Sequence, residues 1–231
     1  PKGMLIYSLM RSKKICGFYG KTLDKKYQLR MLQKHIIRDV VFYGEDAINQ
    51  DCVLVEGQED RVAMLQGGFK HVAALQGQIS KHQIDKLKRG RKHLYLCFDM
   101  DEGGRNYAKD IIKEVSSIRP VSIINLATIN GDNIPEGWDG DPEFFDNWAS
   151  KVLEIDERSE PKVFPVKDID DFMQMGKFNP LLKDFLIDHA EDGIDYYIGM
   201  IPPVKDMPTR KADLIITPIV KAIAKIQDPK L

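Results

Sequence analysis

The sequence predicts an α/β fold in which helices flank a parallel sheet, with a small basic α+β subdomain before it and a helical subdomain after it. Between residues 51 and 126, short and nearly continuous apolar runs alternate with helical patterns of about ten residues, which is typical of a parallel sheet covered on both faces. Basic residues crowd the start of the chain, and helical patterns dominate its end. We therefore expect subdomains at 1–50, 51–176 and 177–231.

The first 50 residues mix short apolar runs with basic clusters. Residues 4–7 and 15–20 are predicted to be short strands, and Gly17 and Gly20 mark bends or a close approach of the backbone. The segment 30–47 is ambiguous between helix and loop.

The middle of the chain alternates four predicted strands with three predicted helices. The strands, in chain order, are 51–55, 71–75, 93–98 and 121–126. The helices are 60–67, 80–87 and 104–117, of which the second has Ser80 as its cap. Functional groups gather at the carboxyl ends of strands in such sheets, and Glu56, Asp99 and Asp101 all follow strands.

The remainder of the chain is less regular. The acidic stretch 131–160 resembles an insertion, and a further strand is expected at 162–166. Helices are expected at 180–190 and 209–226, with a loop over 196–208 between them. The apolar stripe of the last helix predicts packing in a small helical core.

The formal net charge of −1 conceals a strong asymmetry. Residues 1–38 carry ten basic side chains and one acid, a net charge of +9, whereas residues 131–160 have a net charge of −8. Such asymmetry indicates a surface that binds a polyanion. Three cysteines without a C-x-x-C pair argue against a disulfide framework or a zinc ribbon. No apolar run approaches the roughly 20 residues of a membrane span, so no membrane contact is expected.

The three acids at strand ends form an unusual arrangement. Carboxylates that lie close together raise one another's pKa, and a divalent cation removes that penalty. The Asp-x-Asp pair, Asp99 and Asp101, can present both side chains on one side of the chain. Mg²⁺ prefers carboxylate oxygens and water, so the pattern predicts a magnesium site. The simpler alternative is that these acids only cap helices, since each precedes one.

Two segments resemble the signature motifs of the Toprim domain, which topoisomerases, DnaG-type primases, primase-helicases and some nucleases share. They are residues 53–60 (VLVEGQED) and 96–105 (LCFDMDEGGR). The separation of 43 residues between Glu56 and Asp99 fits the family, as does the intervening strand and turn at 73–77. The resemblance implies a Toprim-type parallel sheet.

Segments before the sheet resemble the catalytic core of DnaG-type primases. Residues 15–21 (ICGFYGK) resemble the "GFGGR" strand, with Lys21 in place of the usual arginine. Lys26 and the tyrosine after it resemble the "KY" element, and Arg38 resembles the lysine that precedes "YG", here Tyr43-Gly44. The resemblance covers roughly residues 7–176.

A third acidic motif is expected after the next strand. Residues 167–171 (KDIDD) resemble the family's "KDPDE", with Ile169 where proline is common. The competing pair is Asp139 and Asp141, which lies at the more usual distance. We favour Asp168 and Asp170 and treat 131–160 as inserted.

The resemblance implies a DNA primase core, a nucleotidyltransferase that makes short RNA primers on a single-stranded DNA template from ribonucleoside triphosphates. The implied catalytic residues are Glu56, Asp99 and Asp101. They would hold Mg²⁺ or Mn²⁺, as two or three ions, and Asp168 and Asp170 would extend this metal site.

Four basic residues are implied to bind nucleic acid or nucleotide: Lys21, Lys26, Arg38 and Arg105. Arg105 could instead form a structural ion pair with the acids. Asp60 is either an acid in the first turn of its helix or a residue that positions the metal ligands without binding the metal itself.

The alternative function is a Toprim-type nuclease, or a non-catalytic nucleic-acid-binding module of a phage, plasmid or mobile-element replication protein. The basic segment that ends in Lys21 favours the primase, because a nuclease has no evident need for it. The resemblance further implies a replicative helicase as partner, through regions outside this chain. The expected location is the cytoplasm of a bacterial or phage-infected cell, at the nucleoid, or an organelle.

Overall fold

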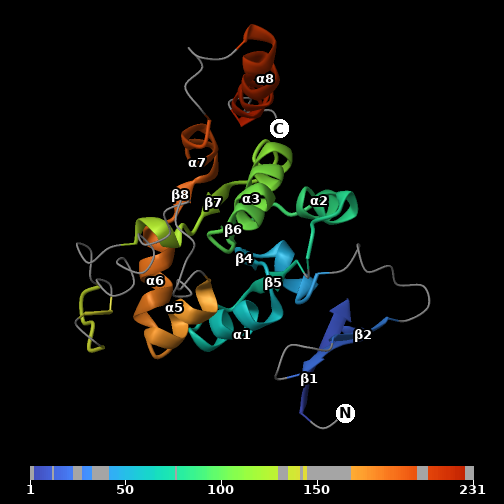
Figure 1. The fold of residues 1–231 in the computed structure, drawn as a ribbon, viewed down its shortest axis with the longest axis vertical. Coiled ribbons are helices and arrows are strands. Elements are labelled where there is room, and N and C mark those ends of the chain that lie inside the picture. Colours follow the sequence, from blue (N-terminus) through green and yellow to red (C-terminus); the bar gives the residue numbers. More distant parts are fainter. Residues whose placement is uncertain are drawn as a thin grey trace.

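The computed structural model describes residues 3–11, 13–22, 28–32, 42–75, 77–129, 135–140, 143–144, 168–201 and 208–226. A three-stranded sheet lies at the N-terminal end, and a five-stranded sheet with helices on both faces forms the centre (Figure 1). The described helices are all too short or too polar to span a membrane.

The N-terminal sheet is antiparallel, in the order β1-β2-β3. Its strands are β1 (Met4–Arg11), β2 (Lys14–Thr22) and β3 (Gln28–Leu32). The two predicted strands are confirmed and are longer than predicted. β3 includes the start of the ambiguous segment 30–47, so the structure assigns part of that segment to the sheet.

The central sheet has the order β5-β4-β6-β7-β8. Its strands are β4 (Cys52–Val55), β5 (Val72–Ala74), β6 (Leu94–Cys97), β7 (Val121–Ile123) and β8 (Glu191–Asp192). The first four are parallel, which confirms the predicted fold class, and β8 pairs with β7 in the antiparallel direction. Sequence patterns do not predict β8 because it consists of two acidic residues.

Seven α-helices accompany the sheets in the described part of the chain. They are α1 (Gln58–Gln66), α2 (Lys81–Leu87), α3 (Glu102–Val115), α5 (Ile169–Met175), α6 (Leu181–Asp188), α7 (Gly193–Gly199) and α8 (Thr209–Ile226). Two short 3-10 helices are also present, η2 (Glu45–Asn49) and η3 (Leu126–Thr128). All five predicted helices are confirmed.

Helix α7 corrects the loop predicted over 196–208. Asp192 begins the helix, because its Oδ1 accepts hydrogen bonds from the backbone N–H groups of Ile194 (2.8 Å) and Asp195 (3.2 Å). The two prolines that favoured a loop lie outside the described residues.

Two cores cover the two faces of the central sheet. Val53 and Val55 pack with α1, α5 and α6, whereas Cys52 and Leu54 pack with α2 and α3. Successive side chains of a strand point to opposite faces, so a strand buried on both sides must be apolar at every position. This explains the continuous apolar run of β4, which is fully buried.

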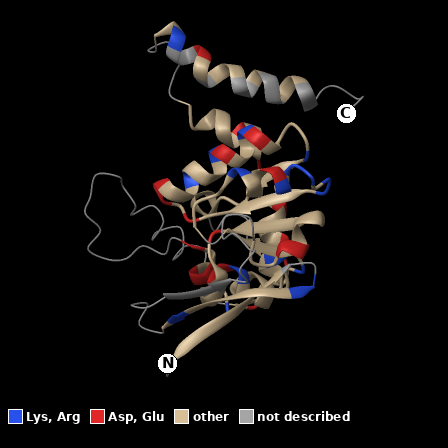
Figure 2. Cartoon of the chain, turned by 90° about the vertical axis from the view of Figure 1, so that its right-hand side faces the viewer, with Lys and Arg blue, Asp and Glu red and all other residues tan. Residues whose placement is uncertain are grey.

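The apolar stripe of α8 is more exposed than predicted. Leu214 and Val220 are 72% and 56% exposed, whereas Ile223 packs against the core that contains α3. Figure 2 shows α8 lying across one end of the molecule. The prediction of a helical core around this stripe is therefore wrong for Leu214 and Val220.

The acidic stretch 131–160 contributes aromatic side chains to the core where it is described. Phe144 is buried, and the ring of Trp138 stacks on it with centroids 5.3 Å apart. Phe144 in turn contacts Phe172 of α5, with ring centroids 5.1 Å apart. The predicted strand at 162–166 lies outside the described residues.

A buried arginine, Arg119, links η2 to the segment before β6 by hydrogen bonds. Arg119 is 2% exposed, and its guanidinium donates to four backbone carbonyl oxygens at 2.5 to 3.3 Å, those of Lys92, Ile48, Gln50 and His93. These carbonyls belong to η2 and its exit, and to the segment before β6. A buried charge is stable only when its hydrogen bonds are satisfied, as they are here.

We predict that Arg119→Met lowers the free energy of unfolding by about 3 kcal/mol or more, because it leaves several buried carbonyl groups without a donor. Urea unfolding measures this change. The matched control is Arg91→Met at an exposed position, which should change stability by less than about 0.5 kcal/mol. Equal unfolding midpoints for the two variants would contradict the role of Arg119.

Candidate metal and nucleic-acid site

The pairing of β4 with β6 brings two predicted site residues together. Val55 lies opposite Cys97 in parallel register, so Glu56 and Asp99 leave the sheet at the same edge. Asp101 follows two residues later and begins α3. The structure thus places the three predicted catalytic acids at one edge of the sheet.

Asp101 caps helix α3. Its Oδ1 accepts a hydrogen bond from the backbone N–H of Gly104 at 3.0 Å, and the positive end of the helix dipole favours its negative charge. Helix capping, the simpler alternative for these acids, therefore holds for Asp101. A carboxylate has two oxygens, so capping through Oδ1 is compatible with a ligand on the other oxygen.

Gly104 allows α3 to begin directly against the end of β6. A Cβ atom at this position would lie 2.1 Å from the carbonyl oxygen of Asp99, a backbone atom that cannot move aside easily. The second glycine of the Gly103-Gly104 pair is therefore required sterically, which explains its place after the Asp-x-Asp pair.

Helix α5 packs against α1 and brings the favoured third motif to the same region. Asp168 caps α5 by accepting from the N–H of Asp171 at 2.9 Å, and Asp170 accepts from the side-chain amide of Gln174 at 2.8 Å. The competing Asp139 instead accepts from the side chain of Asn179 at 2.9 Å. Asp141 lies outside the described residues.

Burial and neighbouring negative charges both raise the pKa of Asp60. Its Oδ2 accepts from the backbone N–H of Gly57 at 2.7 Å. Burial raises the pKa of Asp60 from 3.8 to about 7, against the opposing effect of that hydrogen bond. Three more carboxylates add to the rise through their charge: Asp168, Asp99 and Asp170. We call Asp60 and these three residues, with Glu56 and Asp101, the acidic edge.

The negative charges of the acidic edge also affect the pKa of two other side chains, Cys97 and Tyr107. Burial raises the pKa of the Cys97 thiol, and the charges of Asp60, Asp99 and Asp168 add to the effect. Cys97 is therefore a neutral core residue. Burial also raises the pKa of Tyr107 on α3, with contributions from Glu56 and Asp101. Carboxylates of the acidic edge thus lie close enough to β6 and α3 to raise the pKa of a side chain on each of these elements.

The donor set fits Mg²⁺ or Mn²⁺ chemically, because it consists of carboxylate oxygens. In the part of the chain that the structure describes, however, no three His, Cys, Asp or Glu side chains converge closely enough to hold a metal ion. The acidic edge therefore gathers the charges that a cation would neutralise, and ligation would require the side chains to turn toward one another.

Lys21 is held by an acid of α1. Its Nζ lies 2.5 Å from Oε1 of Glu59, and the hydroxyl of Tyr7 donates to the same oxygen at 2.8 Å. Burial acts to raise the pKa of Glu59, but the hydrogen bonds from Lys21 and Tyr7 outweigh it and lower the pKa. This network fixes the N-terminal sheet beside the acidic edge. Sequence reasoning missed Tyr7 and Glu59, because nothing local indicates that they meet.

An aromatic cluster continues the same contact. Tyr7 stacks on Tyr19, and its ring meets Tyr43 edge-on. Tyr43 pairs through its backbone with Ala74 of β5, at 3.0 and 2.8 Å. Gly44 has a φ of +82°, and a Cβ there would lie 2.6 Å from a backbone oxygen of β5. The Tyr-Gly pair therefore joins the N-terminal sheet to the central one.

Of the other three basic residues predicted to bind nucleic acid, the structure describes only Arg105. Arg105 donates from Nη1 to the carbonyl oxygen of Met100 at 2.7 Å, and so steadies the turn between Asp99 and Asp101. Lys26 and Arg38 lie outside the described residues, and their roles stay predictions.

Comparisons with known proteins agree with this geometry. Residues 53–134, from β4 past β7, match the family model described as Toprim-like. This segment is a Toprim-like domain. It contains the first two acidic motifs, as the sequence resemblance predicts.

Curated relatives of this chain include DNA primases. The DNA primase of Legionella pneumophila is 33% identical in an alignment 111 residues long that covers 42% of this chain and 19% of that protein. The DNA primase of Rickettsia prowazekii is 29% identical in an alignment 146 residues long that covers 59% of this chain and 24% of that protein. The chain thus spans about a quarter or less of the length of these relatives.

Solved structures show the fold. The catalytic domain of DnaG primase bound to single-stranded DNA aligns with a TM-score of 0.64 and 16% identity, over 97% of this chain and 66% of that one. The Aquifex aeolicus primase, with zinc-binding and RNA polymerase domains, aligns with a TM-score of 0.60 and 16% identity, over 98% and 48%. This chain therefore has the fold of the DnaG catalytic core.

We predict that Gly104→Ala lowers the free energy of unfolding by about 2 kcal/mol, because the added methyl group forces α3 away from the end of β6. Thermal or urea unfolding measures the loss. Gly199→Ala, where a Cβ meets no atom within 4 Å, is the control and should be neutral or slightly stabilising. If Gly104→Ala is as stable as this control, the steric argument fails.

We also predict that the protein loses stability as pH rises, because of Asp60. Because its pKa is raised on folding, the folded state binds a proton that the unfolded state has released between pH 4 and 7. The free energy of unfolding therefore falls over this range, and Asp60→Asn removes that part of the fall.

Urea unfolding at pH 5 and pH 8 tests this prediction. The difference between the two pH values should be smaller for Asp60→Asn than for the wild type, and unchanged for the exposed control Asp110→Asn. Parallel pH profiles for the wild type and Asp60→Asn would show that Asp60 does not titrate abnormally.

Proposed function

We propose that this chain is the catalytic core of a DNA primase, which synthesises short RNA primers on single-stranded DNA by metal-dependent nucleotidyl transfer. The observation that carries the proposal is the placement of Glu56, Asp99 and Asp101 at one edge of a Toprim-like sheet. The relationship to DNA primases and the DnaG fold support it.

Primer synthesis needs little covalent help from the protein. The 3′-hydroxyl of the growing primer attacks the α-phosphate of a ribonucleoside triphosphate, and pyrophosphate leaves. Glu56, Asp99 and Asp101 would hold two or three Mg²⁺ or Mn²⁺ ions, with Asp168 and Asp170 extending the site. Bound metal would neutralise charge on the phosphates and align the attacking and leaving oxygens.

The N-terminal sheet would hold the template. A cleft of about 600 Å³ lies between the β1–β2 hairpin and the Toprim-like domain, and three cations, Lys13, Arg61 and Lys70, line it together with two acids, Glu45 and Asp46. Cations in a cleft of this kind attract a phosphate backbone. Lys21, Lys26, Arg38 and Arg105 are the further candidates for contact with template or nucleotide. A DnaG catalytic domain bound to single-stranded DNA has the same fold, which supports this role.

The cellular location and the partner of the protein follow from the same proposal. A primase works in DNA replication, so we place the protein in the cytoplasm at the nucleoid, with a replicative helicase as partner. The helicase would contact regions outside this chain.

A primer-synthesis assay tests the proposal. Single-stranded template, ribonucleoside triphosphates and Mg²⁺ or Mn²⁺ should yield short RNA, and Asp99→Ala should lower the yield by about a hundredfold or more, because a group that stabilises charge in the transition state is lost. Asp110→Ala, an exposed acid on the same helix α3, should leave the yield unchanged. Template cleavage without RNA synthesis would overturn the primase proposal and favour a Toprim-type nuclease.

A further inference from the structure

The contact between the N-terminal sheet and α1 has the form of a filled anion site. Tyr7 of β1 and Lys21 of β2 are diagonal neighbours on one face of the antiparallel sheet. Their polar ends meet at one atom of α1: Nζ of Lys21 lies 2.5 Å from Oε1 of Glu59, and the hydroxyl of Tyr7 donates to the same oxygen at 2.8 Å. An ammonium group and a hydroxyl group thus converge on a single carboxylate oxygen.

The two charged partners of this contact differ in their exposure. The side chain of Lys21 is 14% exposed, whereas that of Glu59 is 31% exposed. A lysine that is so little exposed needs an anion beside it, because the water it has lost is otherwise not replaced. Glu59 lies closer to solvent and can turn outward more easily than Lys21. The acid is therefore the exchangeable partner, and the two donors stay in place when it leaves.

A phosphate group matches the two donors. Its oxygens are negatively charged acceptors, as a carboxylate oxygen is, and they take hydrogen bonds from ammonium and hydroxyl groups. Glu59 lies in the first turn of α1, where the positive end of the helix dipole favours an anion. The net charge of +9 over residues 1–38 attracts a polyanion to this sheet. Ion pairs near a protein surface are weak, so an arriving phosphate can displace Glu59.

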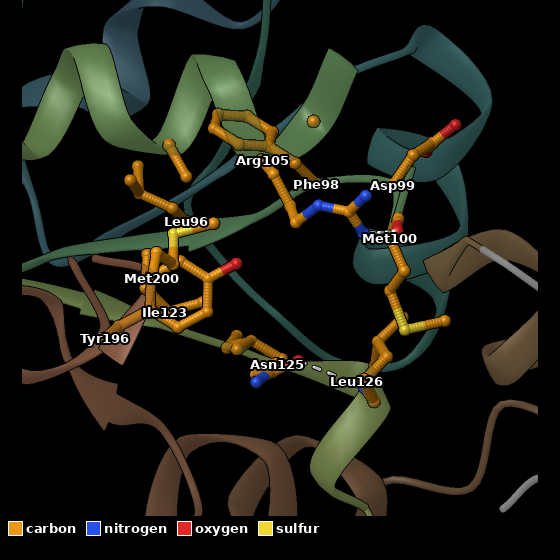
Figure 3. A pocket seen from close by; sticks show the side chains of 14 residues that line it. Leu96, Phe98, Asp99, Met100, Arg105, Ile123, Asn125, Leu126, Tyr196 and Met200 are labelled. Atoms are coloured by element: carbon orange, nitrogen blue, oxygen red, sulfur yellow. Dashed lines mark hydrogen bonds between the residues drawn. The ribbon is translucent and has the colours of Figure 1, made fainter. Parts of the chain in front are cut away.

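The contact lies beside the acidic edge. Glu59 directly precedes Asp60, and the charge of Asp99 contributes to the raised pKa of Asp60. Figure 3 shows that the carboxylate of Asp99 points away from the cavity that Arg105 and Met200 line between α3 and α7. A phosphate held by Lys21 would therefore lie on the α1 side of the acidic edge, close to the acids that we propose to hold metal.

We propose that Tyr7 and Lys21 form a phosphate subsite that Glu59 occupies in the free protein. A phosphate of the template strand or of the incoming nucleotide enters the subsite by displacing Glu59. Glu59 is thus an internal competitor that weakens the binding of phosphate at this point, and Tyr7 is the second donor to the ligand. The choice of a nucleic-acid or nucleotide phosphate as ligand rests on the proposed function.

Fluorescence anisotropy of a labelled oligothymidylate, titrated with the whole chain in EDTA, tests the proposal. EDTA prevents primer synthesis, so binding is measured apart from catalysis. Glu59→Gln removes the competing charge but keeps the size of the side chain, and we expect it to bind about fivefold more tightly than the wild type at low salt. The gain should shrink as salt is added, because salt screens the contact. Glu59→Met serves the same purpose if Glu59→Gln does not fold, as judged by circular dichroism.

Glu114→Gln is the matched control for net charge. It removes one negative charge, as Glu59→Gln does, and it also releases a lysine, because Glu114 of α3 pairs with Lys88. The affinity of this variant for oligothymidylate should change by less than about twofold. If Glu114→Gln gains as much affinity as Glu59→Gln, net charge alone explains the gain and the subsite is rejected.

Tyr7→Phe distinguishes the subsite from an ion pair that only joins the two sheets. The hydroxyl is uncharged, so its removal leaves the net charge of the protein unchanged. We expect Tyr7→Phe to lower the affinity of Glu59→Gln about threefold, because a hydrogen bond to the phosphate is lost. In the wild type the hydroxyl binds Glu59 instead, so the change there should be smaller. Equal effects of Tyr7→Phe in the two backgrounds would overturn the subsite.

A parallel titration with ATP in EDTA identifies the source of the phosphate. A gain by Glu59→Gln for oligothymidylate assigns the subsite to the template strand, and a gain for ATP alone assigns it to the nucleotide. Either result supports the subsite when Tyr7→Phe reverses the gain, and no gain with either ligand overturns it. A gain in a chain that makes no primers would leave the subsite intact and reject the primase function instead.

Discussion

The parallel pairing of β4 with β6 is the constraint on which the site depends. With Val55 opposite Cys97, the chain leaves both strands at the same edge, and the acids that follow, Glu56 and Asp99, therefore lie at that edge. Helix α5, which packs on α1, adds two more carboxylates to that edge. Repulsion among them opposes folding in the absence of a cation. Burial is the main cause of the raised pKa of Asp60, and the charges of Asp168, Asp99 and Asp170 add to it.

The fold reduces this repulsion by means of backbone groups. The N-terminus of α3 binds Asp101, the N-terminus of α5 binds Asp168, and the N–H of Gly57 binds Asp60. Each hydrogen bond stabilises a charged carboxylate and also fixes its position. Helix capping and metal binding are therefore compatible uses of the same residues. The caps hold the acids near the edge, and a cation would draw their remaining oxygens together.

Much of the Toprim-like domain could be predicted from the sequence, because its strands are buried on both faces and so are apolar throughout. The two acidic motifs could be found for the same reason, since each directly follows such a strand. The contacts that depend on tertiary structure could not be predicted. Tyr7 and Glu59 are 52 positions apart, and β8 has no apolar pattern. The apolar stripe of α8 indicated a helix correctly, but not which surface would cover it.

The most direct test of the acidic edge as a metal site is a titration of Mn²⁺ into the protein, followed by the loss of the electron paramagnetic resonance signal of free Mn²⁺. We expect saturable binding at neutral pH that weakens as the pH falls, because protons compete for the carboxylates. Asp99→Asn should weaken the binding strongly, whereas Asp110→Asn should bind as the wild type does. Binding that is absent in the wild type, or equal in Asp99→Asn and the wild type, would contradict the claim that the acidic edge is a metal site.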